Sequence, residues 1–216
     1  MSRQILRSKI LTICENICFM DNEINNVIKK VKNDKNLLLT FSQAQLICYA
    51  VKATQNINGE IAELGVYAGR SAKLIAKFKG NKFLSLFDTF NSCSMIEEFN
   101  YDINEVKKYL QEYSNIRFYE GIFPETIDEY LKQLNFSFVH LDADLYQSTF
   151  DGLKFFYPRL SKDGIIIIHD YNSNKWTGVK KAVKEYFNPL MIGNPFMMEM
   201  NDTQLMIVKR ENVKEG

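Results

Sequence analysis

Three side chains that can bind a metal or carry a proton follow two strongly apolar segments of the chain. Asp142 comes directly after Phe138–Leu141, and His169 and Asp170 follow the run Ile165–Ile168. If the two segments are neighbouring parallel strands, these side chains meet at the carboxyl edge of the sheet. Carboxylates packed together raise one another's pKa unless a cation compensates them, which favours a divalent metal ion. Oxygen ligands with one imidazole suit Mg²⁺, Mn²⁺ or a similar ion.

Two other interpretations of these residues stay open. Polar residues often follow strands simply as turn formers, and Asp144 would then be a helix N-cap. His140 and Asp142 share one face of the predicted strand because they are two residues apart. Together with His169 they make a two-histidine, one-carboxylate set of the kind that non-haem iron oxygenases use. A buried, hydrogen-bonded core histidine is the plainer interpretation of His140.

A glycine-rich turn is predicted at Gly65 and Gly69, after the first β-rich segment. Two glycines four residues apart at the start of a helix let the backbone approach a ligand and aim N–H groups at it. The turn is neither a complete dinucleotide fingerprint nor a Walker loop, so a tight strand-to-helix connection explains it equally well. The next β-rich segment ends at Asp88, where a carboxylate can accept hydrogen bonds from ribose hydroxyls. Together the two features favour an adenosine-containing ligand.

The elements that position these residues alternate from residue 60 onward. Strands are predicted over 60–64, 82–88, 115–120, 136–142, 164–169 and 204–209, and helices over 70–79, 103–113, 124–134, 146–157 and 176–187. This alternation predicts an α/β fold with a doubly wound, mostly parallel sheet and helices on both faces. The stretch 195–209 lacks a helix, so we expect a hairpin that adds one antiparallel strand.

The first 57 residues are predicted to be a helical cap, ahead of one compact unit over 58–216. Two apolar stripes with helical period run over Ile5–Ile17 and Ile24–Val31. Ser42, followed three residues later by Gln45, predicts a capping box at the start of a third helix. The first stripe can pack on the domain's own sheet or on a second subunit, and we expect a homo-oligomer.

Composition excludes several classes of protein for this chain. The 216 residues carry a net charge of +1 and are 46% hydrophobic, which excludes a wholly disordered chain. The near-zero charge removes the electrostatic argument for nucleic acid or an anionic membrane as partner. No apolar run approaches the ~18 residues of a membrane span. Glu15 breaks the N-terminal apolar stretch, which argues against a secretory signal, and four cysteines without a Cys-x-x-Cys pair suit a reducing compartment. A cytoplasmic protein is expected.

At the glycine turn and at the ends of the predicted strands, the sequence resembles the macrocin O-methyltransferase family (TylF/MycF-like). Members of this family are S-adenosylmethionine-dependent enzymes with the class I methyltransferase fold. The matching stretches follow the family's order and cover most of residues 60–187. They are 61–71, 87–90, 140–149, 157–160, 164–171 and 178–182.

The resemblance implies a Rossmann-like class I methyltransferase fold, with a seven-stranded sheet whose last strand is antiparallel. It implies that S-adenosyl-L-methionine is bound by Glu63, Gly65, Val66, Tyr67, Gly69, Ser71, Asp88, Thr89 and Asp142. It also implies a divalent metal, Mg²⁺ or Mn²⁺, on the catalytic set Asp142, His169 and Asp170. That metal would hold the acceptor hydroxyl of a sugar or another small molecule of secondary-metabolite type.

Two departures from the family pattern affect this expectation. His169 stands where the family usually has aspartate, which removes a negative charge and shifts the metal preference toward Mn²⁺, Fe²⁺ or Zn²⁺. Asn91 and Ser92 stand where the family commonly has Glu-Gly. We therefore expect a metal-assisted O-methyltransferase with His140, His169 or Lys175 as general base. The alternative is a non-catalytic adenosyl-ligand-binding module that keeps the fold but has lost the metal.

Overall fold

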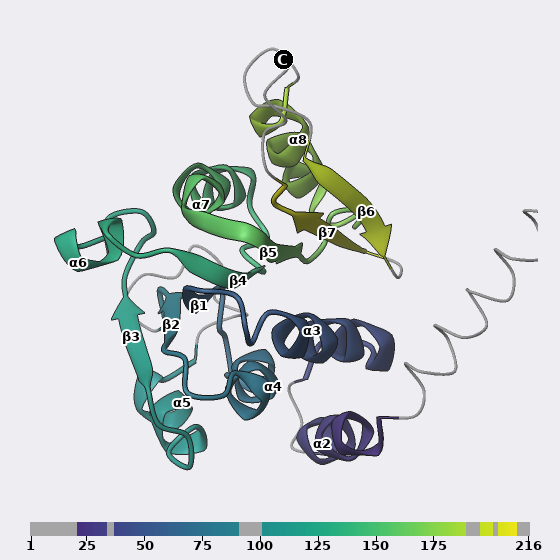
Figure 1. Ribbon diagram of the computed structural model, residues 1–216, viewed down its shortest axis with the longest axis vertical. Helices are drawn as coiled ribbons and strands as arrows, with labels where there is room; N and C mark the ends of the chain where they lie inside the picture. Colours follow the sequence, from purple (N-terminus) through teal and green to yellow (C-terminus); the bar gives the residue numbers. More distant parts are fainter. Residues whose placement is uncertain (1–20, 34–36, 91–100, 189–194, 201–202, 211–216) are drawn as a thin grey trace, which may run out of the picture.

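The structure, a computed structural model, describes residues 21–33, 37–90, 101–188, 195–200 and 203–210. A seven-stranded sheet with the order β3-β2-β1-β4-β5-β7-β6 forms its centre (Figure 1). The strands are β1 (Glu60–Leu64), β2 (Leu84–Asp88), β3 (Ile116–Glu120), β4 (Phe136–Leu141), β5 (Leu160–Ile168), β6 (Phe196–Met200) and β7 (Gln204–Val208). Strand β7 is antiparallel to both β5 and β6, whereas β1 to β5 are parallel. The predicted α/β sheet and its C-terminal hairpin are confirmed.

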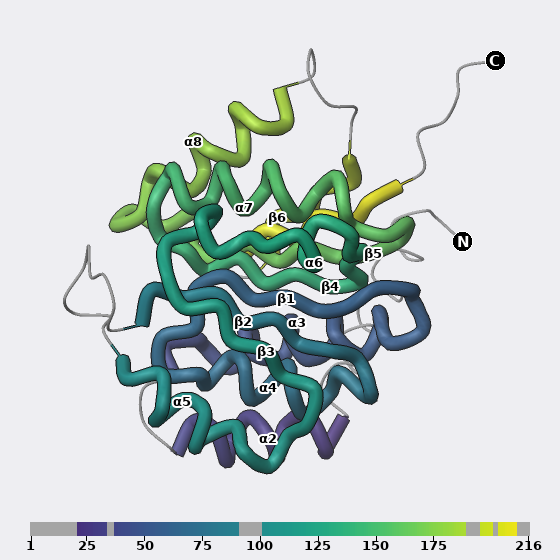
Figure 2. The backbone as a smooth tube through the Cα atoms, turned by 90° about the vertical axis from the view of Figure 1, so that its left-hand side faces the viewer, coloured from purple at the N-terminus to yellow at the C-terminus, as the bar shows by residue number. Residues whose placement is uncertain are grey.

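Helices cover both faces of the sheet. They are α2 (Asn22–Asn33), α3 (Phe41–Ala53), α4 (Arg70–Phe78), α5 (Ile103–Tyr109), α6 (Glu129–Lys132), α7 (Tyr146–Arg159) and α8 (Thr177–Tyr186). Figures 1 and 2 show α2 to α5 on one side of the sheet and α6 to α8 on the other. Ile61 belongs to the core on the first side and Ala62 to the core on the second, because successive strand residues face opposite ways.

Three predicted elements have wrong boundaries. Helices α5 and α6 are shorter than the predicted 103–113 and 124–134, because both segments continue as turns outside the helix. In the second segment the helix begins only after Asp128, whose side chain accepts the N–H of Leu131. Strand β5 begins at Leu160 rather than at residue 164, because Leu160 pairs with Phe136 before a register shift in β4.

The capping box of α3 lies two residues earlier than predicted. Thr40, rather than Ser42, is the N-cap, and it exchanges hydrogen bonds with Gln43 in both directions. The pattern Ser/Thr-x-x-Gln occurs twice in overlapping positions, so the pattern alone does not choose between them. The earlier start lets Leu39 and Ala44, which flank the first turn, both be buried.

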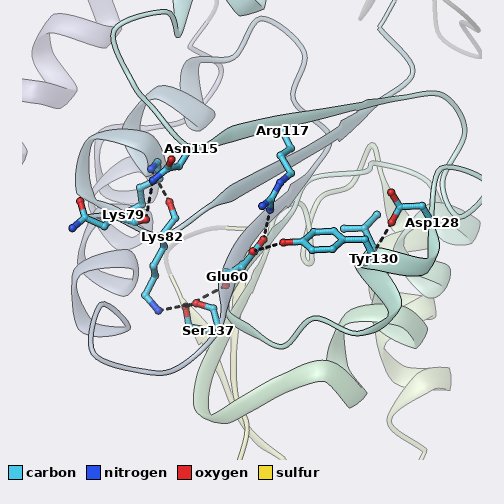
Figure 3. Close-up of polar contacts among 11 residues, drawn as sticks. Glu60, Lys79, Lys82, Asn115, Arg117, Asp128, Tyr130 and Ser137 are labelled. Atoms are coloured by element: carbon cyan, nitrogen blue, oxygen red, sulfur yellow. Dashed lines mark hydrogen bonds and ion pairs between the residues drawn. The ribbon is translucent and has the colours of Figure 1, made fainter.

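Polar contacts join the amino ends of the strands, opposite the edge where ligands are expected (Figure 3). The carboxylate of Glu60 accepts from Arg117 Nη1 at 2.7 Å and from the Tyr130 hydroxyl at 3.1 Å. Lys82 Nζ donates to the carbonyls of Ile57 and Gly59. These contacts hold β1, β2 and β3 in register at their starts.

Some expectations fall on residues outside the described ranges: the stripe Ile5–Ile17, the pair Asn91-Ser92 and three of the four cysteines. The described cysteine, Cys48, is a free buried thiol, and burial raises its pKa to about 12. Among the described helices, none combines the length and apolar character needed to cross a bilayer.

Candidate functional site

A cavity of about 620 Å³ lies at the carboxyl edge of the sheet. The segments that line it follow the five parallel strands, as expected for an open α/β sheet. The lining residues are drawn from 64–71, 87–89, 121–123, 142–148 and 169–176, and residues 37–39 add to the wall ahead of α3. The cavity has the size of a cofactor or drug-like ligand site.

The turn after β1 requires glycine at its first position. Gly65 has φ +91°, and a β-carbon there would lie 1.9 Å from the carbonyl oxygen of Asp142. The Asp142 N–H in turn donates to the carbonyl of Leu64 at 2.8 Å. The backbone of the glycine turn therefore touches the backbone at the end of β4, and both border the cavity.

Asp88 organises the same turn. One of its carboxylate oxygens accepts the N–H groups of Val66 at 2.6 Å and Tyr67 at 2.8 Å, and the other accepts the N–H of Phe90 at 2.8 Å. A carboxylate has about four acceptor positions, so one remains for a further donor. Asp88 also lines the cavity, which is where a ribose hydroxyl would need it.

Seven of the nine residues predicted to contact the cofactor line the cavity: Gly65, Val66, Tyr67, Ser71, Asp88, Thr89 and Asp142. Glu63 and Gly69 do not. Gly69 has φ +73° and packs against α5, where a β-carbon would lie 2.8 Å from Val106 Cγ1. Its role in the structure is thus to let α4 approach α5.

Glu63 forms a fully enclosed pair with His140 across β1 and β4. The two residues are register partners, and Glu63 Oε1 lies 2.8 Å from His140 Nδ1. Both side chains have no exposed surface. Burial raises the pKa of Glu63, although His140 opposes this shift. His140 is therefore the hydrogen-bonded core histidine of the plainer interpretation, and it does not line the cavity.

Asp142, His169 and Asp170 converge, as predicted. Their candidate ligand atoms all lie within 4.8 Å of one another. His169 Nδ1 is 3.0 Å from Asp142 Oδ1 and 3.1 Å from Asp170 Oδ2. Although these distances are short, neither ring nitrogen makes a hydrogen bond of acceptable angle within the described chain. The two carboxylates and the imidazole are partly buried and converge on one point, so this three-residue set has the chemistry for a divalent metal.

Without a metal the cluster is held by charge. Burial opposes protonation of His169, but Asp142 and Asp170 outweigh it and raise the pKa of His169 to about 11. Burial likewise favours a neutral Asp142, but the His169 imidazolium outweighs it and lowers the pKa of that carboxyl. The positive charge of the imidazolium thus compensates the two carboxylates, as a bound metal ion would do in its place.

Asp144 is a site residue that the sequence analysis did not select. It lines the cavity with φ +58°, and Leu145, not Asp144, is the N-cap of α7. The turn-former interpretation of Asp144 as a helix cap is therefore wrong. Burial, together with the charges of Asp142 and Asp170, raises the pKa of Asp144 to about 8. Asp144 lies only two residues after Asp142 in the sequence, and this spacing could have indicated that it belongs to the same site.

Comparisons with known proteins found similarity to O-methyltransferases. The family model described as macrocin-O-methyltransferase (TylF) matches residues 103–205. A relative from Streptomyces olivaceus, 8-demethyl-8-(2,3-dimethoxy-alpha-L-rhamnosyl)-tetracenomycin-C 4'-O-methyltransferase, is 35% identical over 80 residues. That match covers 37% of this chain and 29% of the relative, so it spans less than a third of the relative's length.

Solved structures show the same fold. The O-methyltransferase NovP superposes with a TM-score of 0.67 at 21% identity, over 77% of this chain and 78% of its own. The calicheamicin methyltransferase CalS11 gives 0.62 at 17% identity, over 87% and 93%. MycE, solved with Mg, SAH and mycinamycin VI, gives 0.63 at 14% identity, over 91% and 57%. The Rossmann-like fold that these methyltransferases share is confirmed for this chain.

Proposed function

We propose that this chain is an S-adenosylmethionine-dependent O-methyltransferase that acts on a hydroxyl of a sugar or another small molecule of secondary-metabolite type. The observation that carries the proposal is one cavity in which the glycine turn with Asp88 adjoins the cluster Asp142, His169 and Asp170. For methyl transfer, the cofactor methyl group and the acceptor hydroxyl must meet in line. In this cavity the glycine turn would bind the cofactor, and the neighbouring cluster would bind the acceptor. The names of the Streptomyces olivaceus relative and of CalS11 support an acceptor of this class.

The residues at the glycine turn fit the cofactor. Gly65 lets the turn after β1 pack directly on the backbone at the end of β4, and Asp88 keeps one acceptor position for a ribose hydroxyl. Thr89 and Ser71 add hydroxyl groups to the same wall. We infer that these residues hold the adenosyl and methionine parts, and that Glu63 and Gly69 support them from behind.

The residues at the ends of β4 and β5 fit a divalent metal. We infer that Asp142, His169 and Asp170 hold it, with Mn²⁺ preferred over Mg²⁺ because one ligand is an imidazole. When bound, such an ion supplies Lewis-acid polarisation of the acceptor hydroxyl.

Asp144 is our proposed general base. It lines the same cavity from the turn between β4 and α7, beside Asp142, so its carboxylate can reach an acceptor hydroxyl held at the cluster. Of the earlier candidates, His140 is enclosed within the sheet and His169 belongs to the metal cluster. Lys175 lines the cavity and is the second candidate.

The iron-oxygenase alternative loses its geometric basis, because His140 is bonded to Glu63 inside the sheet and does not join the cluster around His169. The non-catalytic module would bind the same cofactor and differ from the enzyme only in transferring no methyl group.

Calorimetric titration of S-adenosylhomocysteine, with and without Mn²⁺, tests whether the chain binds the cofactor. We expect micromolar binding, followed by transfer of labelled methyl groups from S-adenosylmethionine to a sugar acceptor. Absence of binding under both conditions contradicts the proposal, and binding without transfer to any of a panel of hydroxyl acceptors favours the module.

A further inference from the structure

A chain of hydrogen bonds links the first turn of α3 to the turn after β5, although the two are far apart in sequence. Gln43 Nε2 donates to Thr203 Oγ1 at 2.8 Å. The carbonyl of Thr203 accepts the N–H of Tyr171 at 2.7 Å. Tyr171 directly follows Asp170, a residue of the candidate metal cluster. Figure 1 shows the end of the β6–β7 hairpin, where Thr203 lies, on the side of the molecule that carries α3.

The conformation of Asp170 depends on how the chain is held on either side of it. Its φ of +59° lies in the left-handed region, which aspartate adopts more readily than most residues but which is only one of the conformations open to it. One residue before Asp170 the chain is held by the hydrogen bond from His169 N to Leu141 O at 2.8 Å, and the peptide after Asp170 is held by the one from Tyr171 N to Thr203 O. Between these two anchors, Asp170 Oδ2 lies 3.1 Å from His169 Nδ1.

Gln43 is the side chain that ties Thr203 to the helical layer. Gln43 is only 4% exposed, and both ends of its side-chain amide are used, since Oε1 accepts the N–H of Thr40 while Nε2 donates to Thr203. Loss of the Thr203 hydroxyl would leave a buried amide donor without its partner. The rigid start of α3 therefore determines where the Thr203 carbonyl can lie.

We propose that Gln43 and Thr203 are positioning residues for metal binding, because they hold Asp170 in the conformation that completes the cluster with Asp142 and His169. This inference rests on the proposed metal site. It adds that metal binding also depends on the contact between Gln43 and Thr203, which lies outside the cavity. Gln43 and Thr203 do not line the cavity and act only through the backbone at Tyr171.

The central experiment compares Thr203→Val, which is nearly isosteric but has no hydroxyl, with Thr203→Ser, which keeps the hydroxyl. Mn²⁺ affinity is measured by electron paramagnetic resonance, and S-adenosylhomocysteine affinity by calorimetry. We expect Thr203→Val to weaken Mn²⁺ binding at least tenfold while leaving S-adenosylhomocysteine affinity within twofold. Thr203→Ser should restore the Mn²⁺ affinity to within about threefold of the wild type.

A matched control separates positioning from stability. Thr40→Ala removes the side-chain cap of α3 but keeps the backbone N–H that Gln43 Oε1 accepts. We expect it to lower the melting temperature by about as much as Thr203→Val, with Mn²⁺ affinity unchanged. Hydrogen exchange at the Tyr171 amide gives a readout that needs no metal, and we expect it to be at least tenfold faster in Thr203→Val alone.

A double-variant cycle tests the link itself. Gln43→Met and Thr203→Val should each weaken Mn²⁺ binding, and their combination should be no worse than the stronger single variant. Thr203→Val with Mn²⁺ affinity within twofold of the wild type, or Thr40→Ala with the same loss as Thr203→Val, would overturn the positioning role alone. A wild-type protein that binds S-adenosylhomocysteine but not Mn²⁺ would overturn the metal site and this proposal together.

Discussion

A β-carbon on Gly65 would lie 1.9 Å from the carbonyl oxygen of Asp142, so the turn after β1 and the end of β4 are in direct backbone contact. Gly65 belongs to the proposed cofactor wall, and Asp142 belongs to both that wall and the metal cluster. The two halves of the candidate site are thus joined through the main chain at this contact, and a substitution at Gly65 is expected to displace Asp142.

Gly65→Ala is expected to damage both folding and cofactor binding. The new methyl group meets backbone that cannot move aside, and φ +91° is strained for alanine. We expect the free energy of unfolding to fall by about 3 kcal/mol or more, and S-adenosylhomocysteine binding to be lost. Gly80→Ala is the matched control, because Gly80 has φ +63° with open space around it, and should cost only about 1 kcal/mol. Urea denaturation and calorimetry measure both, and equal effects would contradict the prediction.

Asp88→Ala removes three hydrogen bonds from the glycine turn together with the acceptor proposed for ribose. We expect S-adenosylhomocysteine binding to weaken by about 1–3 kcal/mol in a calorimetric titration. Asp128→Ala, which removes the side-chain cap of α6, should lower stability by about 1 kcal/mol without changing that affinity. An unaltered dissociation constant in Asp88→Ala would show that the assignment of Asp88 is wrong.

Metal binding is expected to strengthen with rising pH. In the metal-free protein the pKa of His169 is about 11, so its imidazole is protonated through neutral pH. A metal-ligating imidazole must be neutral, so binding displaces about one proton and the affinity rises about tenfold per pH unit on the alkaline side of neutrality. Calorimetry in buffers of different ionisation enthalpy measures the proton release. Mn²⁺ affinity independent of pH would argue that His169 is not a ligand.

His169→Asp should convert the cluster toward the pattern usual in the resembled family. The substitution adds a negative charge and removes the proton that binding must displace, so we expect Mg²⁺ affinity to rise about tenfold or more at neutral pH. The ratio of Mn²⁺ to Mg²⁺ affinity should fall, because the imidazole ligand is gone. His169→Asn, which supplies neither imidazole nor charge, is the control and should bind both ions weakly. Similar Mg²⁺ affinities in the three proteins would refute the ligand assignment.

His140→Leu should lower the free energy of unfolding by about 3–5 kcal/mol, because it leaves the fully buried Glu63 carboxyl without its partner. The double variant Glu63→Leu/His140→Leu should recover much of that loss, since an apolar pair of similar volume is often tolerated in place of a buried ionic one. Chemical denaturation of the three proteins gives the coupling. A double variant as unstable as the sum of the singles would mean that the pair is not the reason for the loss.

Most of the architecture follows from local pattern. Apolar runs such as Ile165–Ile168 and their alternation with helical periods predict a parallel sheet, because a strand buried on both faces must be apolar throughout. Once the sheet is parallel, the residues that follow its strands share one edge. The meeting of Asp142 with His169 and Asp170 was therefore predictable without coordinates.

Only the tertiary structure decided the features that depend on register and close approach. The pairing of Glu63 with His140 requires β1 and β4 to be adjacent in one particular register, which no local pattern encodes. Strand β5 begins early because Leu160 pairs with a residue of β4. Two overlapping capping motifs precede α3, and Thr40 is the N-cap in the structure, where the adjacent Leu39 and Ala44 are both buried. The contact of Gln43 with Thr203 joins segments 160 residues apart. The sequence by itself determines which residues end the strands, whereas packing between distant segments determines which of their atoms meet.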